Sequence, residues 1–309
     1  MHHPNVETSL RGLLLALEDR AYDFVTPSNS TIATVRARRS TAREGSLRDV
    51  LGWSLPFLPG TLDDEIEGLL VGADALRECE LGLKATVRVS RVQARLFLHS
   101  AYPTDEQDAV FLGPDSYRFA EFLRVELGDG PIGSLCDVGA GAGVGGLIAA
   151  SLAEVDRLLL CDVNSKALQL AKVNAAHAGQ RAELVEAPGL AGVEGDLDLI
   201  VANPPFVAGS GRPYSEGGGA YGAGLSLQWA TEAMGKLKAG GRLLLYTGSA
   251  IVEGRDLFRA ALQAEADSRR CGLAYRELDP DIFGGLLRQP AYQEVERIAA
   301  VGAVVTRRN

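Results

Sequence analysis

Residues 135–143 read LCDVGAGAG, an apolar run that leads into glycines at alternate positions. Glycine lets the backbone turn sharply and lets a ligand approach where a Cβ would collide. Because a helical pattern follows at residues 145–154, this stretch predicts the first strand–turn–helix unit of a nucleotide-binding sheet. A Walker phosphate loop is excluded, since the Gly-Lys-Ser/Thr sequence is missing. Gly141-x-Gly143-x-x-Gly146 also satisfies the dinucleotide fingerprint, so the loop alone leaves the ligand open.

Strand and helix patterns alternate on the C-terminal side of this loop. Apolar runs predict parallel strands at 134–138, 157–161, 182–186, 197–202 and 242–247. Helical patterns at 145–154, 165–178 and 225–237 lie between them. This series predicts an α/β fold with a doubly wound, mainly parallel sheet. Two further strands, at 271–278 and 296–306, are expected to pair as an antiparallel edge and to complete a seven-stranded sheet.

The N-terminal third has a different pattern of apolar and polar residues. We expect a small accessory α+β domain at residues 1–109, for substrate recognition or as a lid, and a catalytic domain at 110–309. Helical spacing occurs at 10–22 and at 62–81, where Gly68 and Gly72 interrupt the second helix. Between residues 85 and 98 apolar and polar residues nearly alternate, which predicts a half-exposed strand or hairpin.

Composition narrows the class of protein. The 309 residues are 46% hydrophobic and 23% charged, as in a globular protein with a substantial core. No apolar run is long enough to span a bilayer and no secretory leader is visible, so we expect a cytoplasmic protein. The cysteines and histidines lack metal-ligand spacing, and we expect free thiols and no metal.

The net charge of −9 argues against a protein that coats nucleic acid non-specifically. Two local basic runs remain as candidate phosphate contacts or as solvated faces. They are Arg36, Arg38, Arg39, Arg43 and Arg48, and then Lys84, Arg88, Arg91 and Arg95.

Acidic residues at the strand ends discriminate between the possible ligands of the loop. Asp137 precedes the first glycine, where a carboxylate would repel a pyrophosphate but suits the ammonium of a methionyl group. Asp162 ends the next strand, where it can accept both ribose hydroxyls. The fourth strand ends in Asn-Pro-Pro-Phe at residues 203–206, a sequence with no place in a nicotinamide enzyme.

Together these motifs resemble those of class I S-adenosylmethionine (SAM) methyltransferases, with a Rossmann-like fold. Asp162-Val163-Asn164, Ala167-Leu168 and Asn174-Ala175 extend the resemblance, which covers residues 110–250. Within the class the chain is similar to the small methyltransferase domain group, which includes HemK-type protein-glutamine enzymes and ribosomal RNA guanine-N2 enzymes. The resemblance implies SAM as cofactor, bound by Asp137, Gly139, Ala140, Gly141, Gly143, Asp162, Val163, Asn164 and Asn203.

Two further assignments are open. The resemblance places an acidic residue near the adenine amine, which here is Glu186, although Glu186 also fits an exposed strand end. Residues 111–116 are similar to the segment that closes over the methionine end of the cofactor in HemK-like enzymes. That similarity implies Asp115 and Ser116 as cofactor contacts, and helix N-capping explains them equally well.

The tetrapeptide suits methylation of a planar nitrogen. The side-chain carbonyl of Asn203 and the backbone carbonyl of Pro204 can accept hydrogen bonds from an NH2 group and so orient its lone pair. Pro204 and Pro205 stiffen the turn, and Phe206 offers a flat face to an amide or base. Beyond it, the glycine-rich residues 209–224 form either a substrate-contacting loop, through Tyr214 and Tyr221, or a passive linker. Residues 279–284 are expected to form another wall of the pocket.

These features favour an N-methyltransferase whose substrate is a macromolecule, either a protein glutamine or an RNA or DNA base. With phenylalanine at its fourth position, the tetrapeptide resembles that of the guanine-N2 enzymes more closely. The acidic net charge, in contrast, argues against a large nucleic acid as the substrate. The alternatives are a small-molecule methyltransferase with the N-terminal domain as a lid, a SAM-binding protein without catalysis and, most distant, a nicotinamide oxidoreductase.

Overall fold

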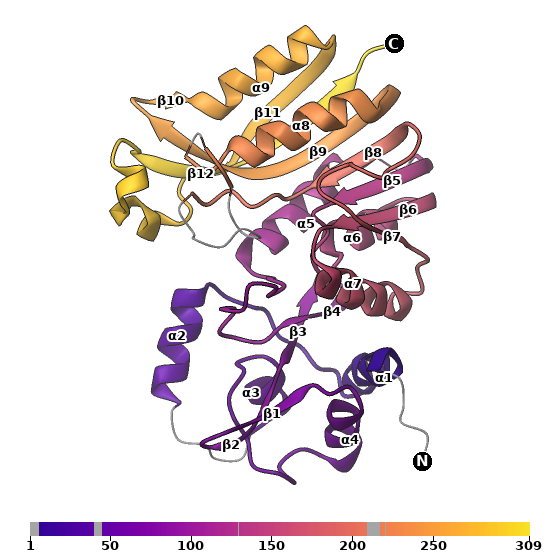
Figure 1. Ribbon diagram of the computed structural model, residues 1–309, viewed down its shortest axis with the longest axis vertical. Helices are drawn as coiled ribbons and strands as arrows, with labels where there is room; N and C mark the ends of the chain where they lie inside the picture. The colour runs from indigo at the N-terminus through magenta and orange to yellow at the C-terminus, as the bar shows by residue number, and fades with distance from the viewer. Residues whose placement is uncertain (1–5, 40–44, 129, 209–216, 220) are drawn as a thin grey trace. The chain divides into compact units, whose positions relative to one another are not determined.

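The computed structural model describes residues 6–39, 45–128, 130–208, 217–219 and 221–309 (Figure 1). The chain divides into two compact units. The N-terminal unit comprises residues 1–120, 141–144 and 166–181, and the sheet unit comprises residues 121–140, 145–165 and 182–309. The boundary at residue 110 between an accessory and a catalytic domain stays a prediction.

The sheet unit is built on a mainly parallel sheet with the strand order β11-β12-β9-β8-β5-β6-β7 (Figure 1). The parallel strands are β5 (Ile132–Val138), β6 (Val155–Asp162), β7 (Glu183–Glu186), β8 (Leu197–Ala202) and β9 (Leu237–Val252). The antiparallel edge is formed by β11 (Cys271–Asp279) and β12 (Arg297–Arg307). The predicted doubly wound α/β sheet is therefore confirmed, but a short strand, β10 (Arg255–Asp256), adds an eighth member beside β9.

The helices of the sheet alternate with its strands. They are α5 (Pro114–Glu126), α6 (Val144–Leu152), α7 (Ser165–His177), α8 (Gly224–Lys236) and α9 (Leu257–Ser268), followed by the short 3-10 helices η2 (Gly284–Arg288) and η3 (Pro290–Tyr292). The sequence patterns above did not single out α9. It buries Phe258, Leu262 and Ala266, one residue per turn, against the sheet unit's core.

Apolar residues fill both faces of the central strands, as expected for a parallel sheet covered by helices. Cys136 and Cys161 lie within this core with their sulfur atoms 3.4 Å apart, and both are free thiols. Cys271 is also buried and free, whereas Cys79 is exposed. No group of His, Cys, Asp and Glu suited to a metal ion occurs among the described residues. Nor does that part of the chain contain a helix long and apolar enough to cross a membrane.

The N-terminal unit combines short helices with two hairpins. Its helices are α1 (Val6–Asp19), α2 (Asn29–Arg38), α3 (Leu47–Leu51) and α4 (Asp64–Gly72), and its strands are β1 (Leu76–Cys79), β2 (Gly82–Ala85), β3 (Val87–Val92) and β4 (Arg95–Ser100). The helix predicted at 62–81 is wrong in its second half. α4 runs through Gly68 and ends at Gly72, and Leu76–Cys79 pairs with β2 instead, because Asp74 turns the chain with a positive φ of 51°.

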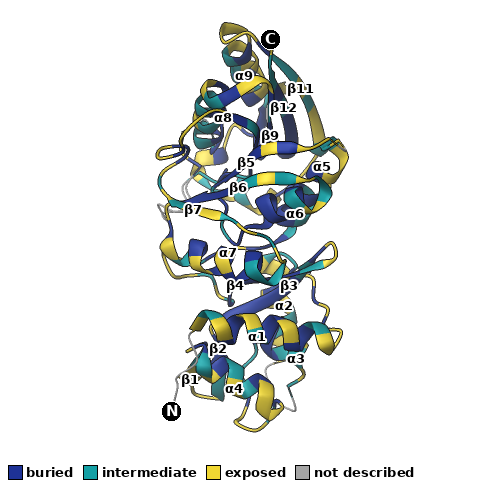
Figure 2. Ribbon diagram, turned by 90° about the vertical axis from the view of Figure 1, so that its right-hand side faces the viewer, coloured by how far each residue is buried: buried dark blue, intermediate teal, exposed yellow. Residues whose placement is uncertain are grey.

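The β3–β4 hairpin is confirmed, but its expected exposed face is wrong. Arg88, Ser90 and His99, all polar, are fully buried. The ribbon of β3 is accordingly coloured mainly as buried in Figure 2. α1 packs on β4 and α3 packs on β3. Thr26 contacts Ser90 and His99, so the face that alternation marks as polar is covered too. Hydrogen bonds satisfy some of the polar groups on this face. Ser90 Oγ lies 2.8 Å from His99 Nε2 and 2.5 Å from Thr26 Oγ1.

Candidate active site

Parallel strands of the sheet unit end together at one edge. On β5, Val138 lies beside Cys161 of β6 and Ala202 of β8. On β6, Asp162 lies beside Glu186 of β7. The chain continues from β5 to β6 on one side and later enters β8 on the other side, so the strand order reverses beside β5. In open α/β sheets, ligands bind outside the carboxyl ends of the strands at such a switch point.

The glycine loop follows β5 directly. Gly139, Gly141 and Gly143 have φ values of 68°, 53° and 81°, a conformation that other residues rarely adopt. A Cβ on Gly139 would collide with the ring of Trp229 on α8. The N–H of Ala140 donates to a carbonyl of β6 at 2.9 Å. The turn is therefore fixed in a shape that requires glycine, as predicted for a ligand-binding loop.

Asp137 is buried at the end of β5, where it is 2% exposed. Its Oδ2 accepts a hydrogen bond of 2.7 Å from the N–H of Gly146 in the first turn of α6. Gly146 itself has no room for a side chain, since a Cβ would lie 2.6 Å from Leu160 Cδ2. Burial raises the pKa of Asp137 to about 7, the nearby carboxylate of Asp162 adds to this rise, and the Gly146 N–H opposes it. A positive charge at this site would stabilise the ionised carboxylate of Asp137.

Asp162 is held by the turn that follows β6. The Asn164 N–H donates to its Oδ1 at 2.9 Å, and the Ala187 N–H donates to its backbone carbonyl at 3.1 Å. Asp162 is buried, whereas Val163 and Glu186 are exposed. The exposed Glu186 agrees with both of its predicted roles, a cofactor contact and a strand end.

The Asn-Pro-Pro-Phe turn follows β8, on the other side of β5. Asn203 and Pro205 are half-buried, whereas Pro204 and Phe206 are buried. Since Ala202 is the register partner of Val138, Asn203 and Gly139 are the first residues beyond two paired strand ends. The sheet therefore brings the tetrapeptide and the start of the glycine loop to the switch point.

Phe206 belongs to an aromatic group within the sheet unit. Its ring makes edge contacts with Phe283, at a centroid distance of 5.6 Å, and with Tyr246 of β9, at 6.5 Å. Gly248 leaves the space that the Phe206 ring fills, because a Cβ there would lie 2.8 Å from Phe206 Cε2. Phe283 is 41% exposed, so this group reaches the surface. The sequence pointed to residues 279–284 only by analogy of fold, and nothing in the strand pattern marked Tyr246.

The loop beyond the tetrapeptide is described in part. Tyr214 lies outside the described residues. The Gly217 N–H donates to the carbonyl of Val207 at 2.9 Å, so the returning chain pairs with the segment after Phe206. The hydroxyl of Tyr221 donates to Glu294 at 2.7 Å. Substrate binding by either tyrosine stays a prediction.

Asp115 and Ser116 lie in the first turn of α5, within the N-terminal unit. Asp115 is 5% exposed, and its carboxylate lies 3.6 Å from the guanidinium of Arg118. The Gly113 N–H donates to Ser116 Oγ at 3.4 Å. These local contacts account for both side chains as helix-start residues, and their assignment to the cofactor remains a prediction.

Asn174, a residue of the sequence motif with no role assigned above, connects the hairpin to the glycine loop inside the N-terminal unit. It is 1% exposed. Its Oδ1 accepts from the Leu98 N–H at 2.9 Å, and its Nδ2 donates to the Leu98 carbonyl at 3.1 Å and to the Ala142 carbonyl at 2.8 Å. One amide thus holds both a strand of the hairpin and the middle of the loop.

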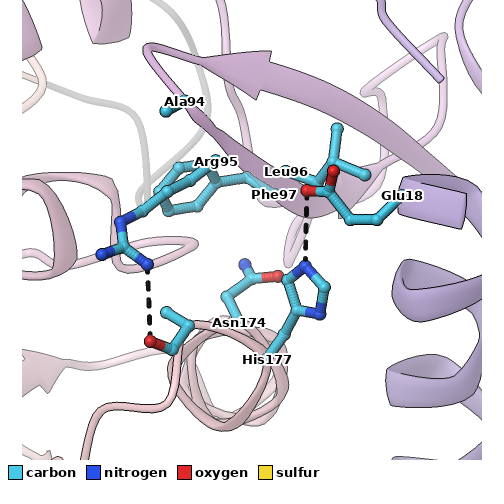
Figure 3. A pocket seen from close by; sticks show the side chains of 8 residues that line it. Glu18, Ala94, Arg95, Leu96, Phe97, Asn174 and His177 are labelled. Carbon is cyan, nitrogen blue, oxygen red and sulfur yellow. Dashed lines mark hydrogen bonds and ion pairs between the residues drawn. The ribbon is translucent and has the colours of Figure 1, made fainter. Parts of the chain in front are cut away.

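The N-terminal unit also contains a cavity of about 170 Å³, where His177 of α7 lies 3.7 Å from Glu18 and Arg95 donates to the Ala178 carbonyl at 3.4 Å (Figure 3). Pockets for nucleotide-sized ligands are about 300 Å³ or more. This cavity is therefore too small for SAM.

The comparisons with known proteins agree with this geometry. The sheet has the fold of M. jannaschii TYW2, solved in complex with AdoMet, at a TM-score of 0.50, with 13% sequence identity over 73% of this chain and 90% of that one. The fold and the glycine loop at its switch point agree with the class I methyltransferase architecture that the sequence motifs predict. Residues 118–251 match the methyltransferase small domain family, and the chain carries such a domain.

Named relatives match part of the chain. Ribosomal RNA small subunit methyltransferase C of Pseudomonas aeruginosa is 34% identical over 153 residues, which are 46% of this chain and 45% of the relative. The enzyme of that name from Ectopseudomonas mendocina is 33% identical over 132 residues, 43% of this chain and 37% of the relative. The chain thus spans less than half the length of the curated relatives it matches.

Proposed function

We propose that this protein is a SAM-dependent N-methyltransferase that modifies an amino nitrogen on a base of RNA. The observation that carries the proposal is the Asn-Pro-Pro-Phe turn at the switch point, one strand away from the glycine loop. The names of the relatives support RNA as the substrate, since they are ribosomal RNA methyltransferases. The protein-glutamine alternative has no such support.

The residues at the strand ends fit the cofactor. SAM supplies a methyl group on a positively charged sulfur. We assign the ribose hydroxyls to Asp162, the methionyl ammonium to Asp137 and the adenine amine to Glu186. The buried, partly ionised Asp137 suits a cationic ligand, because such a ligand lowers the electrostatic cost of its carboxylate. Gly139, Gly141 and Gly143 admit the ligand close to the backbone.

The tetrapeptide positions the acceptor nitrogen. The carbonyls of Asn203 and Pro204 each accept one hydrogen bond from the exocyclic NH2 group, which turns the nitrogen lone pair out of the base plane. Phe206, braced by Phe283 and Tyr246, packs against the base. Correct positioning of a nucleophile is the main contribution that a protein makes to such a displacement.

The test is an Asn203→Ala variant, with Asn203→Asp as its matched control. We expect Asn203→Ala to reduce kcat for RNA methylation about 100-fold, the order of loss caused by misplacement of a reacting group. The Kd for SAM, measured by calorimetry, should change less than about threefold. Asn203→Asp keeps one acceptor oxygen and should retain more activity than Asn203→Ala. Wild-type turnover in Asn203→Ala contradicts the positioning role.

A further inference from the structure

Three cations of the N-terminal unit surround one short stretch of chain, Ser100–Tyr102. The Lys84 ammonium donates to the Tyr102 carbonyl at 2.7 Å. The Arg36 guanidinium lies over the Tyr102 ring, with its carbon 5.4 Å from the ring centroid. Arg88 donates through Nε to the Ser100 carbonyl at 3.2 Å. We call Arg36, Lys84 and Arg88 the cation cluster.

The partners of the cation cluster are neutral. Arg36 donates to the carbonyls of Trp53, at 2.7 Å, and Ser54. Arg88 is 0% exposed, and its Nη1 and Nη2 have no hydrogen-bond partner in the structure. Among the residues that the structure describes, no carboxylate forms a hydrogen bond or an ion pair with any of the three cations.

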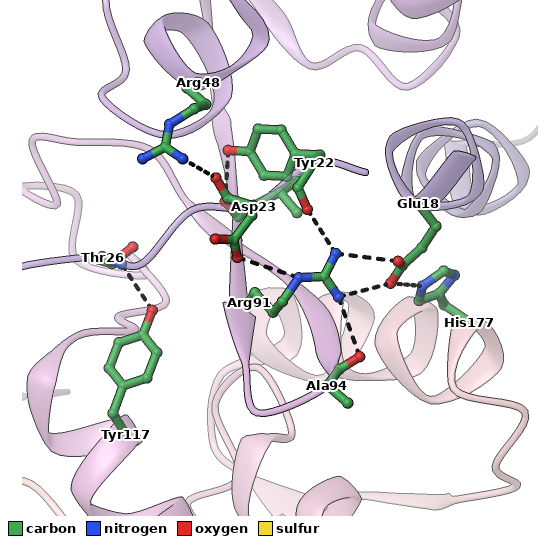
Figure 4. Close-up of polar contacts among 10 residues, drawn as sticks. Glu18, Tyr22, Asp23, Thr26, Arg48, Arg91, Ala94, Tyr117 and His177 are labelled. Atoms are coloured by element: carbon green, nitrogen blue, oxygen red, sulfur yellow. Dashed lines mark hydrogen bonds and ion pairs between the residues drawn. The ribbon is translucent and has the colours of Figure 1, made fainter. Parts of the chain in front are cut away.

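Other arginines of the same unit show how unusual this is. Arg91 lies 3.2 Å from a carboxylate oxygen of Glu18 and 3.4 Å from one of Asp23 (Figure 4). Arg39 lies 2.6 Å from Asp49. These two arginines pair with carboxylates, whereas the more deeply buried Lys84 and Arg88 do not. Exposed Arg48 also has a backbone carbonyl, that of Asp23, as its partner, but there water can solvate the charge.

Burial without a counterion leaves the cluster electrostatically strained. Burial, together with the positive charges of Arg36, Arg77 and Arg88, lowers the pKa of Lys84 to about 8. Burial also lowers the pKa of Arg88 to about 10. Arg77 is moreover the cross-strand partner of Lys84, and like charges in that position repel. An anion beside Lys84 would relieve each of these effects.

We propose that the cation cluster binds a backbone phosphate of the RNA substrate. Arg36 and Tyr102 are half-buried and form the accessible edge. Lys84 is 7% exposed as a residue, and its ammonium has three N–H donors, of which the Tyr102 carbonyl accepts one. Arg88, fully buried behind them, contributes its charge through the low-dielectric interior. The choice of RNA rests on the proposed function, whereas the affinity for phosphate rests on the cluster itself.

The test compares Lys84→Met with Arg38→Met, which removes the same charge from an exposed position on α2. The probe is a mixed-sequence RNA oligonucleotide. We expect Lys84→Met to weaken RNA binding about tenfold and to reduce the slope of log K against log salt by about 0.7, the value for one phosphate of a single strand. Arg38→Met should change the Kd less than about twofold. Lys84→Met should also melt at the same or a higher temperature, a result that a purely structural role for Lys84 does not give.

Further measurements distinguish binding of free inorganic phosphate from binding of an RNA phosphate. Inorganic phosphate should raise the melting temperature of the wild type and of Arg38→Met but not that of Lys84→Met. If Lys84→Met fails to fold, Arg36→Met takes its place with the same expectations. Wild-type RNA affinity and salt slope in these variants overturn the proposal, as does a site that responds to phosphate but not to RNA. RNA methylation by the wild type, followed with labelled SAM, reports on the proposed function separately.

Discussion

The two units of this protein bury charges of opposite sign, apart from Asp115 of the N-terminal unit, which lies beside Arg118. At the carboxyl ends of its parallel strands, the sheet unit buries the carboxylates of Asp137 and Asp162. Beside its antiparallel hairpins, the N-terminal unit buries the cations of Lys84 and Arg88. For Asp137, Lys84 and Arg88 the hydrogen-bond partners among the described residues are backbone groups: an N–H group holds the acid, and carbonyls hold the bases.

This difference matches the two ligands of the proposed reaction. SAM carries a sulfonium and an ammonium, which suit the buried acids. RNA carries phosphates, which suit the buried bases. Charges that are held by dipoles but left without a counterion are costly in the free protein and are stabilised when a ligand of opposite sign binds. Each unit is therefore prepared electrostatically for a different ligand.

The largest expected effect concerns the acids. Asp162→Ala should weaken SAM binding at least about 100-fold, because it removes the acceptor of two hydrogen bonds to a charged group, each contributing about 1.5–3 kcal/mol. Calorimetry with SAM measures the loss. Asp156→Ala, which removes an exposed carboxylate from the same strand, is the control and should bind SAM normally. Equal affinities in the two variants would remove Asp162 from the cofactor site.

A smaller effect is expected at Asn174. Asn174→Ala should raise the Kd for SAM about tenfold, since it releases the Ala142 carbonyl and loses about 1 kcal/mol or more of hydrogen bonding. Hydrogen exchange should accelerate at residues 141–145. Arg95→Met removes a different hairpin-to-α7 hydrogen bond and should leave both properties unchanged. If the loop amides of Asn174→Ala stay protected, the loop does not depend on this residue.

The remaining expected effects are on stability, and they have opposite pH dependences in the two units. Asp137 has a folded pKa of about 7 against an ordinary 3.8, so its contribution to the free energy of unfolding is lost as pH rises through about 7. Lys84 has a folded pKa of about 8 against an ordinary 10.5, so its contribution grows as pH rises from about 8 to 10.5. Solvent screening reduces the Lys84 effect.

Urea unfolding at a series of pH values measures how each of these two contributions to the free energy of unfolding depends on pH. The difference between wild type and Asp137→Asn should depend on pH between about 4 and 7, and the difference between wild type and Lys84→Met between about 8 and 10.5. A pH-independent difference for either pair contradicts the burial of that charge.

The sequence predicted the sheet unit well because its signals are local. The run before Gly139 and the run before Asn203 are each apolar enough to require burial on both faces, and the residues after them carry the chemistry. The N-terminal hairpin was predicted less well. Alternation marks Arg88, Ser90 and His99 as exposed, but tertiary packing buries them, in part through Thr26, which contacts Ser90 and His99. The contact of Phe283 with Phe206 joins distant parts of the chain and leaves no periodic signal in the sequence.

The central claim is that this protein methylates an amino nitrogen of an RNA base. The most direct measurement incubates the wild-type protein with methyl-labelled SAM and separate RNA, DNA, protein and small-molecule fractions, then identifies the labelled product by mass spectrometry. We expect label in RNA, on an exocyclic base nitrogen, and its loss with Asn203→Ala. Label in protein or in the small-molecule fraction, or on a carbon or oxygen atom of RNA, would contradict the account.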